Sequence, residues 1–533
     1  MKSGFAGIRI VKGSKKGEHD HAFPVSEGNA RFSVSEEREE VMAGKVENLT
    51  HAAERQAMSV LIDGLLKTIK NSDDRTETYL KIVDIAAKFY GKGATADKLD
   101  AVRAAIKDPN NRWFKYINRI IDETDPHYAK MMLLNLGYEA FLRGTKTIRA
   151  NREKYGCNIP WLILFDPTMA CNMHCIGCWS GTYGHKSNLS FEDMDKIVSE
   201  GKDLGAYLYM MTGGEPTVRM NDIFRLAEKH NDCFFALYSN STLITDAMCE
   251  RVKELGNITF MLSIEGTPDT NDARRGEGHY AAVMKAMDLL KKHGIVFGTS
   301  ICYTRANIEA VTSDDFFHML EEKGARFGFY FHLMPVGNNA APELMPTVEQ
   351  REYMIKRIRE VRGKDSDICF YPMDFQNDGE FVGGCIAGGR NYFHINSNGD
   401  AEPCVFIHFS NTNIHDNTIL EMLQSPLFMA YHEGQPFNRN HLRPCPMLEN
   451  PQILRQIVEA TGAHQTNLES PESVDHLCEK CDAYSKEWAP VADKIWAEQS
   501  HKRPAYENYT EEKKEHPELA AFEHADGTEH IDL

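Results

Sequence analysis

The sequence predicts an α/β fold with a parallel sheet, preceded by an all-helical region. Two observations predict it. From Trp161 onward, six short apolar runs alternate with amphipathic helical stretches, whereas before that residue the apolar positions recur at helical spacing. Right-handed crossovers would make the six strands parallel, and the reacting groups of such folds lie at the carboxyl ends of the strands. The spacing alone leaves a doubly wound sheet and a partial barrel open.

The elements are expected in the following order. Residues 1–45 are polar and weakly patterned, so an extended chain is expected there. Residues 46–150 predict a helical domain, and Asp125 followed by Pro126 predicts the start of its last helix, which runs to about Arg149. The predicted strands are Trp161–Phe165, Ala206–Met211, Phe234–Ser239, Ile258–Ile264, Ile295–Tyr303 and Phe327–Leu333, and the helices between them lie near 191–204, 221–230, 246–255, 280–293 and 313–324.

The α/β part therefore covers residues 155–345, and a smaller region follows over 346–499. This region begins with a predicted helix at 348–363 and then becomes rich in glycine and cysteine. Asn398 and Gly399 predict the tight turn of a β-hairpin. The polar, acidic residues 500–533 predict a disordered tail.

Composition limits the function. Of the 533 residues, 60 are Lys or Arg and 78 are Asp or Glu, so the net charge of −18 argues against nucleic-acid binding. No apolar stretch is long enough to span a membrane, and the N-terminus lacks the apolar segment of a signal peptide, so a cytoplasmic protein is expected. In a reducing compartment, 13 cysteines favour metal or redox chemistry over disulfides.

Three of these cysteines lie on one predicted loop, just after the first strand. Cys171, Cys175 and Cys178 have the spacing C-x3-C-x2-C. Three thiolates suit a [4Fe–4S] cluster whose fourth iron has no protein ligand, and an open metal position usually binds a substrate or a cofactor. The alternative is a zinc site completed by His174 or His185.

At these residues the chain resembles the radical S-adenosylmethionine (SAM) superfamily, whose characteristic motif is C-x3-C-x2-C. The resemblance covers about 155–345 and implies a partial (β/α)6 TIM-like barrel, with the helical domain before it and a small α+β domain after it. One departure is Gly177, where the family often has an aromatic residue, and Trp179 follows the third cysteine.

The resemblance also implies which residues bind SAM. The motif of Gly213, Gly214, Glu215 and Pro216 follows the second strand, and in the family such a motif binds the amino group of SAM. Physically, glycines allow close backbone approach and a glutamate can meet an ammonium group. The remaining implied contacts are Ser239 and Asn240 to the ribose, Ser263 near Glu265 with Arg274 or Arg275 (preferably Arg275) to the carboxylate and ribose, and Met334 beside the adenine.

A second set of cysteines follows in the C-terminal region. Thirteen residues separate Cys385 from Gly399 and four separate Gly399 from Cys404, which is similar to the SPASM and twitch extensions that hold auxiliary [4Fe–4S] clusters. The favoured ligands are Cys385, Cys404, Cys478 and Cys481, with Cys445 as a replacement or part of a second, incomplete site; a full SPASM domain has seven cysteines and this region has five. A four-cysteine zinc site is the alternative. Buried, inert thiols are expected at Cys157, Cys233, Cys249, Cys302 and Cys369.

The family's chemistry implies an oxidoreductase from an anaerobic source. SAM binds the open iron, one electron from a donor such as flavodoxin or ferredoxin cleaves it, and the resulting 5′-deoxyadenosyl radical abstracts a hydrogen atom from the substrate. A different class, a non-catalytic iron–sulfur carrier or sensor, would need neither the open iron nor the glycine motif.

One segment of the sequence gives a hint about the class of the substrate. Residues 127–154 carry apolar side chains followed by basic ones, so they predict either contact with a membrane surface or a helix packed on the barrel. Some proteins of the type that this chain resembles couple lipid chains, so a hydrophobic, lipid-like substrate for C–C bond formation is put first. A peptide, as in enzymes that mature ribosomal peptides, is the alternative.

Overall fold

The computed structural model describes residues 34–90, 94–108, 110–182, 186–337, 340–468 and 470–498. The chain divides into two compact units, Met1–Glu54 and Arg55–Leu533. The second unit holds the sheet and every site discussed below. The predicted tail, 500–533, lies outside the described residues, and the division of the second unit into helical, barrel and auxiliary domains remains a prediction.

The N-terminal helices begin earlier than the sequence predicts. Helix α1 starts at Val34, so residues 34–45 are helical rather than extended; glutamate, alanine, arginine and methionine there favour a helix without any apolar periodicity. The predicted start at Asp125 is confirmed, because its side chain accepts hydrogen bonds from the backbone nitrogens of His127 and Tyr128. The helices are α1 (Val34–Lys70), α2 (Arg75–Tyr90), α3 (Ala94–Lys107), α4 (Arg112–Glu123), α5 (Pro126–Met132), the π-helix η1 (Leu133–Gly144) and α6 (Thr145–Tyr155).

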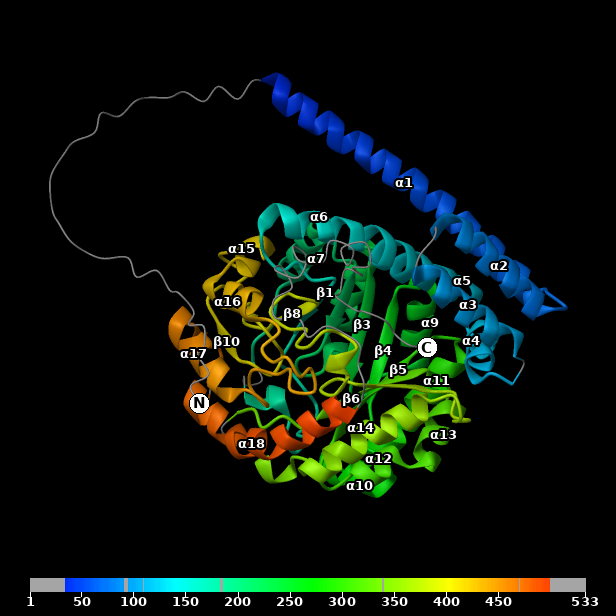
Figure 1. Ribbon diagram of the computed structural model, residues 1–533. Coiled ribbons are helices and arrows are strands. Elements are labelled where there is room, and N and C mark those ends of the chain that lie inside the picture. Colours follow the sequence, from blue (N-terminus) through cyan, green and yellow to red (C-terminus); the bar gives the residue numbers. More distant parts are fainter. Residues whose placement is uncertain are drawn as a thin grey trace. The chain divides into compact units, whose positions relative to one another are not determined.

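A nine-stranded sheet follows, in the order β7-β6-β5-β4-β3-β2-β1-β8-β9. All neighbours pair in parallel except the hairpin of β8 and β9. This arrangement is a partial TIM-like barrel, as predicted, and Figure 1 shows its strands with helices such as α9, α11 and α13 beside them. The strands are β1 (Leu162–Phe165), β2 (Leu208–Met211), β3 (Phe234–Ser239), β4 (Ile258–Ser263), β5 (Gly298–Tyr303), β6 (Phe327–His332), β7 (Tyr371–Asp374), β8 (Tyr392–Ile395) and β9 (Ala401–Glu402).

The C-terminal region contributes strands to this sheet, which the sequence analysis does not predict. β7 extends the sheet beyond β6, and β8 pairs with β1 at the other end. Strands β7 and β8 do not pair with each other; instead, the rings of Phe375 and Tyr392 lie 6.2 Å apart, and those of Phe331 and Phe375 lie 5.1 Å apart. Aromatic contacts therefore bridge the seam that strand pairing leaves open.

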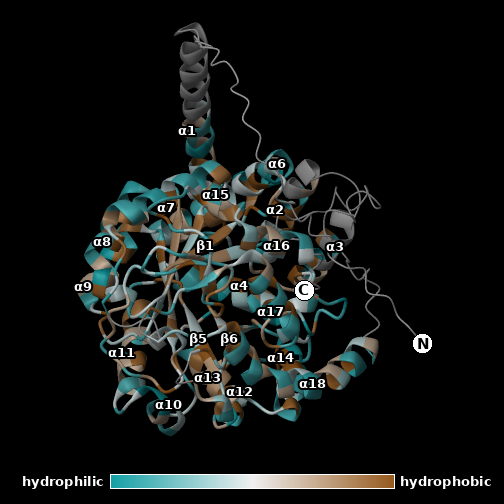
Figure 2. Ribbon diagram, turned by 90° about the vertical axis from the view of Figure 1, so that its left-hand side faces the viewer, coloured by the Kyte–Doolittle hydropathy of each residue, from teal (hydrophilic) through white to brown (hydrophobic). Residues whose placement is uncertain are grey.

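Helices surround the strands on their outer side. Their amphipathic pattern places hydrophilic residues outward, as Figure 2 shows for α8 and α9. The helices between the strands are α7 (Phe191–Leu204), α8 (Met220–Lys229), α9 (Asp246–Leu255), α10 (Pro268–Arg275), α11 (His279–Lys292), α12 (Ile308–Thr312) and α13 (Asp314–Glu322). The later elements are α14 (Val348–Arg362), β10 (Phe409–Ser410), α15 (Ile419–Leu423), α16 (Pro426–Gly434), α17 (Pro451–Thr461), β11 (His464–Gln465) and α18 (Val474–Glu498).

The segment 127–154 packs on the barrel. Tyr128 is fully buried and its hydroxyl donates to the carbonyl of Ile258 over 2.9 Å, and a Cβ on Gly144 would lie only 2.4 Å from the carbonyl of Gly205. Large apolar side chains nevertheless remain exposed on η1, with Phe141 at 52%. In the described part of the chain, no helix is both long enough and apolar enough to cross a membrane.

Candidate active site

The parallel strands bring the predicted cofactor residues to one edge of the sheet. The loop of Cys171 follows β1, the motif of Gly213 follows β2, and Ser239 ends β3. Ser263 ends β4, and Met334 follows β6. The carboxyl ends of parallel strands are where barrel enzymes build their active sites, so the fold supports this edge as the reacting end.

Each thiol of the first cysteine loop has a polar neighbour. Burial raises the pKa of Cys171 and Cys175, and ionised Cys178 would add to the rise. Hydrogen bonds to sulfur tune iron–sulfur clusters, so such neighbours fit a bound cluster. The neighbours are Asn240 Nδ2, 3.9 Å from Cys171 Sγ, Arg275 Nη1, 4.0 Å from Cys175 Sγ, and Ser180 Oγ, 3.3 Å from Cys178 Sγ.

The described residues contain no group of three or more His, Cys, Asp or Glu side chains placed to hold a single metal ion. A [4Fe–4S] cube binds each thiolate at a different iron, so its ligands stand further apart than those of one ion. His185, one of the two histidines of the zinc alternative, lies outside the described residues.

Two glycines allow the backbone after β2 to approach the start of the cysteine loop closely. Gly213 has φ +102°, and a Cβ there would lie 2.5 Å from the carbonyl of Thr168. A Cβ on Gly214 would lie 2.4 Å from the carbonyl of Ala170. The backbone nitrogens of Gly214 and Glu215 donate to these same carbonyls, each over 2.9 Å. Only glycine fits so close an approach, so the motif fixes the start of the cysteine loop.

From the sequence, Glu215 is expected to offer its carboxylate to the amino group of SAM. In the structure this carboxylate is instead held by neighbouring residues of the chain. Glu215 is 1% exposed and accepts hydrogen bonds from the Ser239 hydroxyl at 2.8 Å and from the Asn240 backbone nitrogen at 2.7 Å. Thr217 donates to it from both its backbone and its hydroxyl. Burial raises the pKa of Glu215. The carboxylate therefore joins the ends of β2 and β3 in this structure.

Both candidate arginines pair with Glu265, which is fully buried. Arg274 Nη1 and Arg275 Nη2 lie 2.7 and 2.6 Å from the same oxygen, Glu265 Oε1. The two arginines differ in their other contacts. Arg275 also reaches toward Cys175. Arg274 lines a cavity, and its buried Nε has no hydrogen-bond partner among the described residues. Arg274, rather than the preferred Arg275, thus offers an unused donor.

Three residues support the site although the sequence does not predict a role for them there. His279 Nε2 lies 2.9 Å from the carbonyl of Asn240, and its Nδ1 lies 2.9 Å from the amide of Asn271. Cys302, expected to be inert, lines the cavity, and its backbone nitrogen donates to Glu265 over 3.2 Å. These residues lie on α10, α11 and β5, and no local motif marks them.

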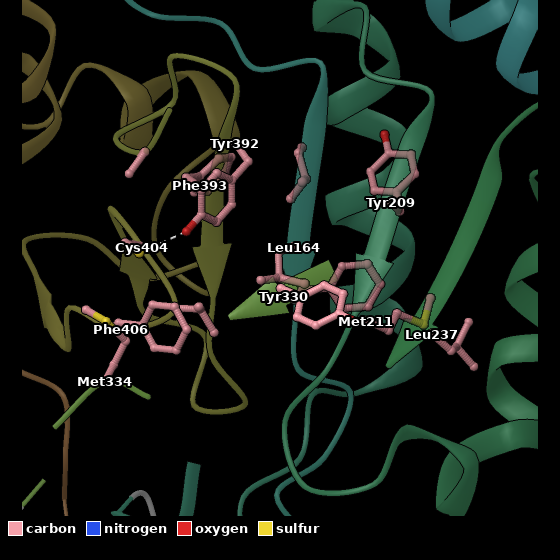
Figure 3. Close-up of a cluster of buried hydrophobic side chains, with 14 of the residues drawn as sticks. Leu164, Tyr209, Met211, Leu237, Tyr330, Met334, Tyr392, Phe393, Cys404 and Phe406 are labelled. Atoms are coloured by element: carbon pink, nitrogen blue, oxygen red, sulfur yellow. Dashed lines mark hydrogen bonds between the residues drawn. The ribbon is translucent and has the colours of Figure 1, made fainter. Parts of the chain in front are cut away.

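The second cysteine set gathers around two tyrosines. Burial raises the pKa of the Cys445 thiol, and the nearby charges of Glu449, Cys385 and Cys404 add to the rise. The Tyr392 hydroxyl lies 2.8 Å from Cys404 Sγ (Figure 3). The Tyr431 hydroxyl is buried with no hydrogen-bond partner among the described residues, and its neighbours include those three cysteines and Cys478. A buried hydroxyl that has no partner and feels the charges of several thiols fits a cluster bound in this region.

This grouping favours Cys445 as a ligand; the sequence alone leaves it either as a replacement for one of the four favoured cysteines or as part of a second, incomplete site. Cys445 Sγ accepts from the backbone nitrogens of Met447 and Leu448, both at 3.4 Å, an arrangement that stabilises a thiolate. Cys478 and Cys481 lie fully buried on one face of α18. Burial raises the pKa of Cys404 and of Cys478 to about 12.

Between the two cysteine regions lies a buried ionic triad that sequence reasoning missed. His394 on β8 contacts Asp166 Oδ1 at 3.0 Å and Glu402 Oε2 at 2.7 Å, and all three are 0% exposed. Burial alone would lower the pKa of His394, but the carboxylates outweigh it and raise the pKa to about 10. The His394 ring stands edge-on to Trp179, with centroids 5.9 Å apart.

A cavity of about 410 Å³ opens inside the barrel. Ser263, Arg274 and Gly177 line it at the carboxyl end of the strands, and Trp161 and Asn391 line it at the other end. Most of its walls are apolar or aromatic. Figure 3 shows part of this core, where Leu164, Tyr392, Phe406 and Met334 are labelled. Such a surface excludes water and binds apolar groups.

Comparison with known proteins identifies the central domain. Residues 166–321 match the family model described as the radical SAM superfamily. The AdoMet-dependent heme synthase of Methanosarcina barkeri is 23% identical over 294 residues, which cover 50% of this chain and 83% of that protein. The mycofactocin maturase MftC of Mycobacterium ulcerans is 27% identical over 302 residues, which cover 53% of this chain and 79% of that protein.

A solved structure is also similar. Streptococcus suis SuiB bound to S-adenosylmethionine has 18% sequence identity and a TM-score of 0.44, covering 52% of this chain and 69% of that chain.

Proposed function

We propose that this chain, which belongs to the radical SAM superfamily, abstracts a hydrogen atom from an apolar group of its substrate inside the barrel. Its cofactors are a [4Fe–4S] cluster and SAM, with an auxiliary cluster of the SPASM type. When bound, the first cluster supplies the electron that cleaves SAM to a 5′-deoxyadenosyl radical. The observation that carries the proposal is the apolar cavity that begins at the same edge as the cysteine loop.

The proposed roles of the chain's own residues follow from their positions. Cys171, Cys175 and Cys178 would hold the cluster. The unused Nε of Arg274 would bind the SAM carboxylate or ribose, and Ser263 and Met334 line the cavity where the rest of SAM would lie. Glu215 would act indirectly, by fixing Ser239 and Asn240.

For the auxiliary cluster we propose Cys385, Cys404, Cys445 and Cys478 as ligands. Their support is that the charges of all four thiols raise the pKa of Tyr431, after burial, and that its buried hydroxyl has no hydrogen-bond partner among the described residues. This set replaces Cys481 of the sequence-based choice by Cys445. A one-electron donor such as flavodoxin or ferredoxin is proposed for the cytoplasm, where we place the protein.

The substrate class has two candidates. The maturases among the relatives favour a peptide, and an apolar side chain of that peptide would enter the cavity. The relatives reported above lend no support to a lipid-like substrate or to membrane contact. The apolar cavity, together with the exposed Leu133, Phe141 and Leu142, keeps a lipid-like chain as the second candidate.

The test is SAM cleavage. The full chain is reconstituted with iron and sulfide without oxygen, and dithionite and SAM are added. We expect 5′-deoxyadenosine as a product, and we expect deuterium in it when a deuterated substrate is supplied. Absence of 5′-deoxyadenosine from protein with a full iron content would reject the proposed function. Small molecules extracted from anaerobically purified protein would separate a peptide from a lipid by mass.

A further inference from the structure

The cavity reaches both ends of the strands. Ser263 lies at the carboxyl end of β4, whereas Trp161 and Asn391 immediately precede β1 and β8. The cavity therefore continues from the reacting edge to the opposite end of the strands. This barrel is partial, and its interior is open over the whole height of the strands, which leaves room for a ligand away from the reacting edge.

The depth of the cavity follows from the sheet geometry. The Leu162 backbone nitrogen donates to the carbonyl of Asn391 over 3.2 Å, so both residues lie at the same level. From Asn391 to Ile395 the chain rises by four residues of β8, and a strand rises by roughly 3.3 Å per residue, or about 13 Å in all. Side chains of a peptide held at the reacting edge are shorter than this depth.

The far end of the cavity has an unused polar group. Asn391 is 5% exposed, and its buried Oδ1 has no hydrogen-bond partner among the described residues. A buried acceptor without a partner costs stability unless something donates to it. Because Asn391 lines the cavity, a donor on a bound ligand would satisfy it.

Aromatic side chains lie between this end of the cavity and the surface. Trp161 is half-buried and lines the cavity, and its ring lies 5.5 Å from that of Phe141. Phe141 is 52% exposed.

We propose that the barrel interior binds an elongated apolar chain whose polar end donates a hydrogen bond to Asn391 and whose apolar end lies at the reacting edge. The ligand class is an amphiphile with an alkyl chain and a hydroxyl or amide group. This assignment deepens the proposed function, on which it rests for the meaning of the reacting edge, and it selects the second of the two substrate candidates.

The test uses dye displacement and omits SAM and reductant. The fluorescent dye 1-anilinonaphthalene-8-sulfonate is bound to the reconstituted full chain and displaced by straight-chain primary alcohols. We expect the affinity to rise about fourfold per methylene until the chain fills the cavity. 1-Decanol is expected to bind about fivefold more tightly than its isomer methyl nonyl ether, which has no donor.

Two variants sharpen the result. Asn391→Leu should abolish the preference for the alcohol over the ether. Phe329→Trp should shorten the longest alcohol that still gains affinity, because Phe329 lines the cavity; this variant tests the site even if Asn391→Leu does not fold. Ile117→Ala, on the exposed face of α4, is the control and should change neither property.

Three outcomes would overturn the assignment. Affinity that does not depend on chain length would reject the elongated site, and equal affinity of 1-decanol and the ether for the unaltered chain would reject the role of Asn391. N-acetyltyrosinamide binding that is weakened by Asn391→Leu as 1-decanol binding is would instead identify a peptide side chain as the ligand. The proposed function is judged separately, by 5′-deoxyadenosine formation.

Discussion

The two cysteine-rich regions differ in how their thiols are enclosed. In the first loop Cys178 is exposed and Cys171 and Cys175 are half-buried. In the second set Cys404, Cys478 and Cys481 are buried, and Cys385 and Cys445 are half-buried. A site that exchanges a small molecule must be open, whereas electron transfer needs no such access. An exposed thiol is found only in the first of these two regions, which agrees with the proposed binding of SAM there.

The largest expected effect comes from the open region. Replacing Cys171, Cys175 and Cys178 together by alanine should reduce 5′-deoxyadenosine formation to background, because no thiolate would remain to hold the cluster. Product is measured by chromatography after anaerobic reaction with dithionite and SAM. Cys249→Ala, which changes a fully buried thiol of α9, is the control and should retain product. Cleavage by the triple variant would contradict the assignment of this loop.

The enclosed region should respond differently. Cys445→Ala is expected to lower the iron content by up to one cluster while SAM cleavage continues, since the first loop is intact. Cys481→Ala is the matched variant, because Cys481 is the cysteine that our ligand set omits. Iron and sulfide are measured per protein. Equal iron loss in both variants, or loss in Cys481→Ala only, would show that the four-cysteine set is wrong; zinc in place of iron would favour a structural zinc site.

Sequence predicts the open region better than the enclosed one, for a physical reason. Cys171, Cys175 and Cys178 lie on one short loop, so their spacing alone brings them together. Cys385 and Cys445 meet only through the tertiary fold, and the place of β8 next to β1 has no local signal. The first six strands follow from apolar periodicity. No sequence motif marks Asn391 or His394, because the contacts that give them a role are made with residues far away in the chain.

A third prediction concerns the charges of the open region. Glu265 is fully buried between two arginines, and breaking a buried pair costs about 3–5 kcal/mol because charge is left uncompensated. Glu265→Gln should therefore lower the free energy of unfolding by about this amount, measured by chemical denaturation. Asp246→Asn is the matched control: its carboxylate also pairs with a cation, Lys292, at 2.6 Å, but its side chain is 59% exposed, so a much smaller change is expected. Similar losses would contradict the burial argument.

A fourth prediction tests the triad between the two regions. The pKa of His394 in the folded chain, about 10, lies above its ordinary value of 6.5. Its contribution to stability is therefore complete below pH 6.5 and is lost as the pH rises toward 10. Asp166→Asn removes one carboxylate, so the decline should end at a lower pH. The decline is measured as the change of the unfolding midpoint with pH over this range. Asp195→Asn, beside the less buried His230, is the control. An unchanged pH profile in Asp166→Asn would mean that Asp166 does not hold His394 charged.

The smallest expected effect is a backbone one, at the residue where the open loop departs from its family. Gly177 has φ +66°, which disfavours a side chain, and a Cβ there would lie 3.2 Å from Leu333 Cδ1. Because that contact is the end of a flexible side chain, Gly177→Ala should cost only about 1–2 kcal/mol. Gly156→Ala is a fitting control, since Gly156 also has a positive φ, of +62°, with open space around it. Iron content and the unfolding midpoint are measured for both. Loss of the first cluster in Gly177→Ala alone would show that the loop tolerates no shift between Cys175 and Cys178, and full occupancy in both would show that the open loop adapts to a side chain at this position.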